Sequence, residues 1–460
     1  MVFASPVVHI AACFGDTPTR RPNIVYINAD DLGVMDVGFN EGQFHTPHID
    51  ALARRGMVFT NAYAPAANCA PSRACVHSGQ WTPRHGVYTV GSSERGKSAR
   101  RKLVPIANTL FLADEKITIA ESLRDAGYRT IHLGKYHIGK DPLADGFEVN
   151  VGGDHSGSPN GGYYSPWNKG AMSEWTSKVD GRTHRCDVFA EEAARFIAEH
   201  HDEPMFVHFS PYLVHTPLTP VAEFVDRYED SPIDSRYGSM VQKLDQAVGR
   251  LVAAIDEHDL ASDTLIVFSS DNGGVAAIHS QSPLRAGKGS YYEGGIREPM
   301  VVSWSGRIEA GSRCATPVTT LDLYPTFMAL AGARVPERQT LDGTDLSGLL
   351  LQTSVLEPRD LFWHFPIYLQ AFSGSEDDAR DRFFRTRPGS VMRSGRWKLH
   401  EYFEDAAIEL YDLESDPGER NNLASAWPQL ASELHARLVQ WRHRVDAPIP
   451  TQPNPDYRED

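Results

Sequence analysis

Short runs of apolar and β-branched residues recur along the chain and predict strands. They occupy residues 23–28, 128–133, 205–210, 264–270 and 300–304. Stretches with helical spacing lie between or after them, at residues 117–127, 187–200, 239–258 and 320–330. The 239–258 stretch has the clearest pattern, an apolar stripe formed by Met240, Leu244, Ala247, Leu251 and Ile255. Strands without an alternating polar face, such as 23–28, indicate parallel strands buried on both sides.

The character of the sequence changes at about residue 356. Strand-like pieces follow at residues 362–366, 390–398 and 409–413, and a last helix is predicted at 427–444. The final residues are polar and rich in proline, which predicts a loosely held tail. We therefore expect a main α/β domain at 20–350, a smaller subdomain at 356–445 and a tail at 446–460.

The composition is that of a globular protein, with 460 residues, 41% hydrophobic and 23% charged. A formal net charge of −15 argues against nucleic acid and against an anionic membrane surface as partners. It does not exclude an anionic substrate, because a few nearby cations determine the charge of a small pocket. No apolar run is long enough for a transmembrane helix.

The cysteine content and the first residues say little about the compartment. Of the five cysteines, Cys13, Cys69, Cys75, Cys186 and Cys314, none forms a Cys-x-x-Cys pair, and spacing does not reveal disulfide pairing. No Asn-x-Ser/Thr sequon is present. Residues 1–14 are mildly apolar but lack the basic start of a signal peptide, although residues 10–13 resemble a bacterial lipoprotein cleavage box.

Acidic side chains follow the first predicted strand. Asp30 and Asp31 come directly after residues 23–28. In an open α/β sheet, ligands collect at the carboxyl ends of the strands. Two adjacent carboxylates repel each other there unless a cation joins them. The pair is therefore either half of a cation site or an ordinary aspartate-rich turn.

Basic and imidazole side chains follow two other predicted strands. Lys135 and His137 come after residues 128–133, and a spacing of two places them on one side of an extended segment. His215 comes shortly after residues 205–210. Such groups supply a cation for an oxyanion and a carrier for a proton. The alternative is a solvated lysine with histidines that only satisfy local hydrogen bonds.

The segment Asn68-Cys69-Ala70-Pro71-Ser72-Arg73 contains Cys-x-Pro-Ser-Arg, which resembles the signature of the type I sulfatases. By itself it would leave Cys69 as a small buried hydrophobe or a disulfide partner. Further pieces of the family pattern follow in order, so that the resemblance runs from about residue 20 to about residue 445. These pieces are residues 79–86, 134–139, 215–217, 271–274, 285–290 and 291–299.

The resemblance implies a specific nucleophile. In the family, a maturation enzyme oxidises the signature cysteine to an aldehyde, formylglycine. The hydrated aldehyde carries two hydroxyls on one carbon, so that one attacks sulfur and loss of the second proton then expels the sulfate. A serine would stay sulfated and would need a separately activated water.

The resemblance also implies a fold and a set of residues. The expected fold is an alkaline-phosphatase-like mixed sheet flanked by helices, with a smaller C-terminal antiparallel sheet plus helix. The implied catalytic residues are Cys69, Arg73, Lys135, His137, His215 and Lys288. The implied ligands of Ca²⁺, or of Mg²⁺, are Asp30, Asp31, Cys69, Asp271 and Asn272. Candidates for contact with the rest of a substrate are His155, Trp363 and His364, with interdomain core as the alternative for Trp363.

We expect a hydrolase acting on sulfate esters of a sulfated carbohydrate, located outside the cytoplasm of a bacterium in periplasmic, secreted or lipid-anchored form. Two other functions stay open. Some relatives use the same cysteine as phosphonate monoester or phosphodiester hydrolases, and a relative could keep the scaffold only to bind carbohydrate. Zinc phosphatases of the superfamily fit less well, because two metals need more His and Asp ligands.

Overall fold

The computed structural model describes residues 21–40, 42–372 and 378–459. The possible leader at 1–14, with Cys13, lies outside the described residues. The other four cysteines are buried and free. No described helix is long and apolar enough to cross a membrane. The division into domains at 20–350 and 356–445 and the location outside the cytoplasm stay predictions.

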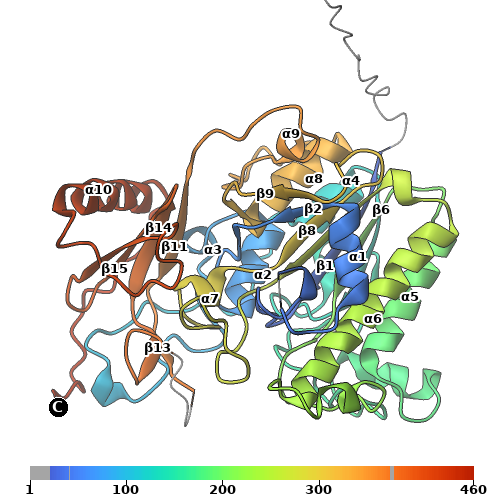
Figure 1. The fold of residues 1–460 in the computed structure, drawn as a ribbon, viewed down its shortest axis with the longest axis horizontal. Helices are drawn as coiled ribbons and strands as arrows, with labels where there is room; N and C mark the ends of the chain where they lie inside the picture. The colour runs from blue at the N-terminus through green and yellow to red at the C-terminus, as the bar shows by residue number, and fades with distance from the viewer. Residues whose placement is uncertain (1–20, 41, 373–377, 460) are drawn as a thin grey trace, which may run out of the picture.

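A mixed sheet forms the centre of the molecule (Figure 1). Its eight described strands run in the order β5-β4-β6-β1-β7-β8-β2-β9, and every pairing is parallel except those of β8 with β7 and β2. The strands are β1 (Asn23–Ala29), β2 (Met57–Phe59), β4 (Arg129–Gly134), β5 (Val149–Val151), β6 (Met205–Ser210), β7 (Thr264–Ser270), β8 (Met300–Ser303) and β9 (Ser312–Cys314). The parallel order brings the carboxyl ends of β4, β6, β1 and β7 to one edge.

Helices cover both faces of this sheet. Alternate residues of β1 enter two different cores: Val25 and Ile27 pack with α1, α5 and α6, whereas Ile24 and Tyr26 pack with α2, α4 and α8. The helices are α1 (Pro47–Arg55), α2 (Cys69–Ser78), α3 (Thr82–His85), α4 (Ile119–Asp125), α5 (Arg185–Glu199), α6 (Ser235–Glu257), α7 (Glu293–Ile296), α8 (Leu323–Ala331), α9 (Ser347–Leu350) and α10 (Pro428–Arg444). Burial on both faces explains why the strands lack a polar face.

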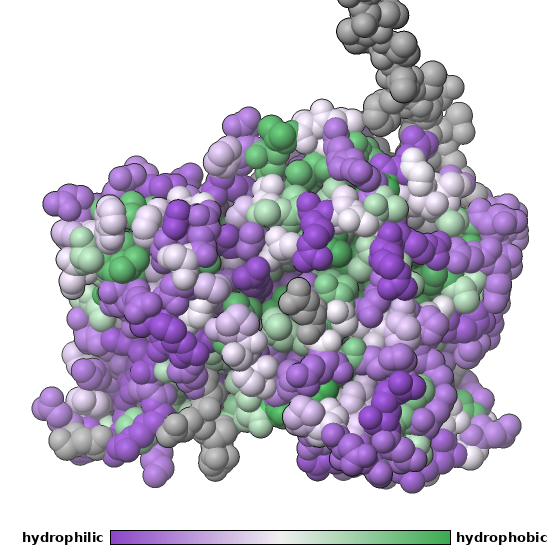
Figure 2. All heavy atoms as spheres, viewed as in Figure 1, coloured by the Kyte–Doolittle hydropathy of each residue, from purple (hydrophilic) through white to green (hydrophobic). Residues whose placement is uncertain are grey.

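Short 3-10 turns join these elements. They are η1 (Gly38–Asn40), η2 (Ser98–Arg100), η3 (Pro142–Asp145), η4 (Ala171–Lys178), η5 (Val225–Tyr228), η6 (Ala261–Asp263) and η7 (Thr320–Asp322). The predicted helix at 320–330 is therefore η7 followed by α8. The face of the molecule seen in Figure 2 is mostly hydrophilic, with small hydrophobic areas scattered over it.

A second, antiparallel sheet forms the C-terminal part, with α10 packed against it (Figure 1). Its order is β11-β14-β15-β16, formed by β11 (Asp360–Phe365), β14 (Gly389–Ser394), β15 (Trp397–Tyr402) and β16 (Ile408–Asp412). Two small pairs complete the strands: β3 (Ala62–Tyr63) with β10 (Val318–Thr319), and β12 (Leu369–Gln370) with β13 (Phe384–Thr386). The predicted fold class is confirmed, but the piece predicted at 390–398 is a hairpin that turns at Gly395.

The prediction of a loosely held tail at 446–460 is wrong for the described residues. Leu103 forms a β-bridge with Pro453, and the Asn454 backbone N–H donates to the carbonyl of Lys102. The Asn454 side-chain amide donates to the carbonyls of Ser98 and Arg101. These bonds join segments about 350 residues apart in the sequence, so composition alone could not reveal them.

Candidate active site

Three buried aspartates meet where β1 and β7 end. The two strands pair in parallel with Ala29 opposite Ser270, and the next residues are Asp30 and Asp271. The Asp31 backbone N–H donates to Asp271 Oδ1 at 3.2 Å. Asp30, Asp31 and Asp271 each offer an oxygen within 4.8 Å of the others, and all three residues are buried. The strand register thus assembles the three carboxylates.

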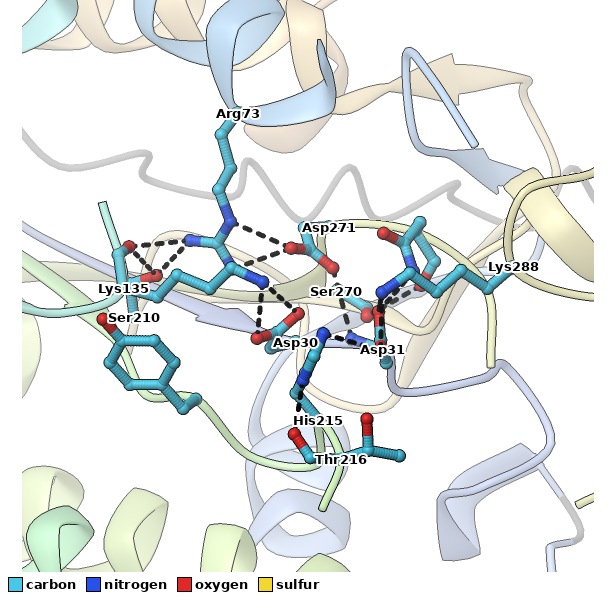
Figure 3. Close-up of polar contacts among 12 residues, drawn as sticks. Asp30, Asp31, Arg73, Lys135, Ser210, His215, Thr216, Ser270, Asp271 and Lys288 are labelled. Atoms are coloured by element: carbon cyan, nitrogen blue, oxygen red, sulfur yellow. Dashed lines mark hydrogen bonds and ion pairs between the residues drawn. The ribbon is translucent and has the colours of Figure 1, made fainter. Parts of the chain in front are cut away.

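Each carboxylate has a basic partner from another part of the chain (Figure 3). Lys135, which follows β4, places its Nζ 2.8 Å from Asp30 Oδ2. Lys288 Nζ lies 2.7 Å from Asp31, and Arg73 Nε donates to Asp271 Oδ2 at 2.9 Å. The site therefore holds three negative and three positive side chains and is balanced by the chain alone.

Helix α2 begins at Cys69, and its N-terminus therefore lies at the candidate nucleophile. Backbone N–H groups at a helix N-terminus favour negative charge. One turn later, Arg73 points to the strand ends, where its Nη1 donates to the Lys135 carbonyl at 3.0 Å and to the Ser210 hydroxyl. All ten residues of α2 are buried, so the helix holds Cys69 and Arg73 rigidly. Burial raises the pKa of the Cys69 thiol, although Lys135 opposes this.

The oxygen ligands of this site fit a hard divalent cation. Asn272 donates through Nδ2 to Asp31 Oδ1 at 2.9 Å, which leaves its carbonyl oxygen available. Asn272 Oδ1 is buried, and no described residue donates to it. Three carboxylate oxygens and one orphaned amide oxygen are typical ligands of Ca²⁺ or Mg²⁺. A second group of potential ligands, Asp30, Cys69 and His215, lies beside the first.

Burial dominates the electrostatics of the aspartates. It raises the pKa of Asp30 and of Asp271, although Lys135 and Arg73 oppose the rise. At Asp31, burial also favours the neutral form, but Lys288 and then His215 outweigh it and lower the pKa. Positive charge added between these residues would favour the ionised form of all three carboxylates.

A cavity of about 420 Å³ opens onto Cys69. Asp31, His137, His215 and Lys288 line it together with Cys69, whereas Lys135 is fully buried against Asp30. Cys69 is itself only 2% exposed, so a substrate must enter the cavity to reach it. The cavity thus combines a candidate nucleophile, the Lys288 ammonium and two imidazoles.

The two histidines are held differently. His215 lies 3.8 Å from Asp31, and burial lowers its pKa to about 4 although Asp31 opposes this. His137 has a left-handed backbone (φ 69°), so the predicted extended segment at Lys135–His137 is wrong. The chain needs glycine at 157, because a Cβ there would lie 2.5 Å from His137 Nε2. His137 Nδ1 is buried, and no described residue bonds to it.

The three predicted substrate-contacting residues have different locations. His155 is exposed on a second cavity of about 400 Å³, which shares His137 and Gly157 with the first. Trp363 is 1% exposed, and its indole N–H donates to the Ala64 carbonyl at 2.8 Å. His364 is also 1% exposed and bonds to Ser390 and to the Pro448 carbonyl. Both residues lie on β11 and are buried, and neither lines the two cavities, so contact with a substrate is contradicted; for Trp363 the burial agrees with the core alternative.

Sequence reasoning missed other residues of the first cavity. Arg95, Phe372 and Arg385 line it: Arg95 lies before η2, Phe372 two residues after β12, and Arg385 on β13. No local sequence pattern predicts that these residues line a cavity, because only the tertiary fold brings residues 95 and 385 together.

Comparisons with known proteins agree with this geometry. The family described as Sulfatase matches residues 22–333, and the family described as N-sulphoglucosamine sulphohydrolase, C-terminal, matches residues 287–444. The chain is 31% identical to human arylsulfatase A over 97% of this chain and 92% of that protein. It is 29% identical to a sulfatase of Formosa agariphila over 93% of this chain and 90% of the relative.

Among solved structures, Ps i-CgsB in complex with k-i-k-neocarrahexaose is similar with a TM-score of 0.76 and 27% identity, covering 96% of this chain and 95% of the other. The family match covers the strand ends, α2 and the Lys288 segment that build the site. The chain therefore belongs to the sulfatase family, within the alkaline-phosphatase-like superfamily, and is a sulfuric ester hydrolase.

Proposed function

We propose that this sulfatase hydrolyses sulfate esters of a sulfated carbohydrate, with formylglycine made from Cys69 as nucleophile and one Ca²⁺ held by Asp30, Asp31, Asp271 and Asn272. The observation that carries the proposal is the orphaned Asn272 oxygen beside three carboxylates at the foot of the Cys69 cavity. Mg²⁺ is the alternative ion with the same ligand preference.

Formylglycine at position 69 and the divalent cation would each supply one part of the chemistry. An aldehyde hydrate at position 69 supplies one hydroxyl that attacks sulfur and a second hydroxyl whose deprotonation expels the sulfate, and a bound divalent cation adds positive charge for the sulfate oxygens. The chain's own residues bind the sulfate group and position the reacting groups. Lys288 lies on the cavity wall, where its ammonium binds a sulfate oxygen. Arg73 and Lys135, fully buried, fix the aspartates and add positive charge below position 69.

The two histidines carry protons. His215 faces the cavity from the loop after β6, so in its protonated form it donates to the leaving alcohol. His137 faces the same cavity, where it would accept the proton of the second hydroxyl at position 69. The effect of replacing His215 should depend on the leaving group, because His215 assists departure of the alcohol. The effect of replacing His137 should not.

Similarity to known proteins supports a carbohydrate substrate. A pig relative named N-acetylgalactosamine-6-sulfatase is 28% identical over 94% of this chain, and Ps i-CgsB carries a neocarrahexaose. The cavity lining offers charged and imidazole groups for a polar substrate, among them His137, His215 and Lys288, beside the apolar side chains of Val90, Val275, Leu369 and Phe372.

Maturation is tested by making the protein with and without a formylglycine-generating enzyme. We expect an aldehyde or its hydrate at position 69, by peptide mass spectrometry, only in the co-expressed and active sample. Cys69→Ala is the matched inactive control. Full activity with an intact Cys69 thiol would overturn the proposal, and an unmodified, inactive Cys69 in protein from its own host would favour a carbohydrate-binding relative.

The reaction itself is tested with matched aryl sulfates and aryl phosphonate monoesters. We expect kcat/KM to be higher on the sulfate, and the opposite order would favour the phosphonate hydrolase. His215→Ala should reduce kcat on alkyl sulfates, which have poor leaving groups, more than on aryl sulfates. The exposed His443→Ala is the control. Equal losses on both substrates would mean that His215 only positions the substrate.

A further inference from the structure

We propose that Arg95 and Arg385 bind a second anionic group of the substrate, so that the preferred saccharide carries another sulfate or a carboxylate near the ester that is hydrolysed. This inference rests on the proposed function and names the class of saccharide. Both arginines line the same cavity of about 420 Å³ as Cys69 and Lys288. The cavity therefore extends from the reacting position to two guanidinium groups.

The two guanidinium groups are held by one residue. Arg95 Nε donates to Gln370 Oε1 at 3.0 Å, and Arg385 Nε donates to the Gln370 carbonyl at 3.0 Å. Gln370 thus contacts both guanidinium groups. The planar guanidinium fork suits sulfate and carboxylate oxygens.

Arg385 is also fixed against the catalytic segment. Its Nη1 donates to the Lys288 carbonyl at 3.0 Å, and its guanidinium stacks on the Phe372 ring at 3.6 Å from the centroid. Thr386, the next residue of β13, donates to the Gly289 carbonyl. With a side chain only 9% exposed, Arg385 cannot swing away from the cavity as a surface arginine can.

Arg95 offers the more accessible contact. Its described bonds use Nε, towards Gln370, and Nη1, towards the Val90 carbonyl at 3.4 Å. Among the described residues none accepts from its Nη2, so N–H donors remain for a ligand. The described lining of the cavity also includes Lys288, which is paired with Asp31.

The experiment measures competition for one reporter reaction. Matured enzyme hydrolyses 4-nitrophenyl sulfate while hexosamine 6-sulfates compete as inhibitors, in three forms: N-acetylated, N-sulfated, and N-acetylated with a neighbouring uronate. We expect the doubly charged forms to have inhibition constants about tenfold lower than the singly charged form. The N-sulfated and uronate forms show whether the second group is a sulfate or a carboxylate.

Variants separate this role from a structural one. In Arg95→Gln the preference for doubly charged competitors should fall to about threefold or less, and Arg95→Lys should restore part of it. Arg385→Gln should lose the preference as well. Arg313→Gln, an exposed arginine on β9, is the control. A preference that is absent in the wild type, or that survives in both Arg→Gln variants, overturns the inference, whereas absence of any sulfate ester turnover by matured enzyme overturns the proposed function.

Discussion

Lys398, on β15 of the C-terminal sheet, pairs with two buried carboxylates, Glu293 of α7 and Glu419. Its Nζ lies 2.9 Å from Glu293 Oε1 and 3.1 Å from Glu419 Oε1, and all three side chains are fully buried. Glu293 begins α7, which follows the Lys288 segment of the active site. Replacing Lys398 with Met keeps the apolar stem but removes the charge, so the variant tests what the ion pair contributes.

The structure gives the size of the effect. Burial alone would raise the pKa of Glu293, but Lys398, followed by Arg297 and Arg393, outweighs it and lowers the pKa to about 2. Compared with an ordinary value near 4.3, this corresponds to roughly 3 kcal/mol in favour of the charged carboxylate. Removing one partner of a buried pair typically costs about 3–5 kcal/mol. Because Arg297 and Arg393 stay in place, we expect a loss of about 3 kcal/mol in the free energy of unfolding.

The loss should depend on pH with a defined sign. A carboxylate whose folded pKa is depressed stabilises the protein above its unfolded pKa, and this contribution disappears as the pH falls towards the folded pKa of Glu293 near 2. Without Lys398 the folded pKa of Glu293 rises, and this contribution becomes smaller although Arg297 and Arg393 remain. The deficit of the variant should therefore be largest near pH 7 and smaller near pH 4.

Urea unfolding followed by tryptophan fluorescence measures the deficit at both pH values. Arg396→Met is the matched control, since Arg396 lies two residues away and pairs with Asp412 at the surface with its side chain 41% exposed. Its loss should stay below about 1 kcal/mol. Equal losses in the two variants, or a loss for Lys398→Met that does not change with pH, would refute the reasoning.

Three further predictions concern separate parts of the molecule. Asp271→Asn removes one carboxylate ligand and leaves Arg73 without its charge partner, so elemental analysis should find no retained calcium after dialysis; retention equal to wild type would contradict the metal site. Thr118→Ala removes the capping box of α4 and should lower the free energy of unfolding by about 1 kcal/mol in urea titrations, whereas Thr118→Ser should not. Asn454→Ala should speed hydrogen exchange of the amides at 98–104, and unchanged exchange there would show that the backbone bonds hold the tail alone.

The regular elements could be predicted because their signals are local. The strands predicted at 205–210 and 264–270 have the observed bounds. The helix predicted at 239–258 starts earlier, at Ser235, because the Asp234 side chain accepts from the Arg236 and Tyr237 backbone N–H groups. That cap lies before the apolar stripe, so a prediction based on the stripe alone misses the first turn.

The candidate site could be predicted in part. Ligands gather at the carboxyl ends of parallel strands, and this rule together with the signature at Cys69 predicts Asp30 and Asp31 as residues of the site. The resemblance to the family added Asp271. The rim of the cavity could not be predicted in the same way. Burial of Trp363 depends on its packing against Tyr63, and the position of Arg385 depends on Gln370, so neither follows from the residues around it.

An acidic chain can still attract an anionic substrate, because the local charges differ from the total. The net charge of −15 is the total for the whole chain, and salt screens exposed charges beyond about 8 Å. Inside the site, Arg73, Lys135 and Lys288 balance the three aspartates, so a divalent cation would add its full charge. Arg95 and Arg385 add two more positive charges to the cavity lining. A sulfate group that enters the cavity therefore meets positive side chains that the net charge does not reveal, and we expect the cavity rather than the whole protein to determine its affinity.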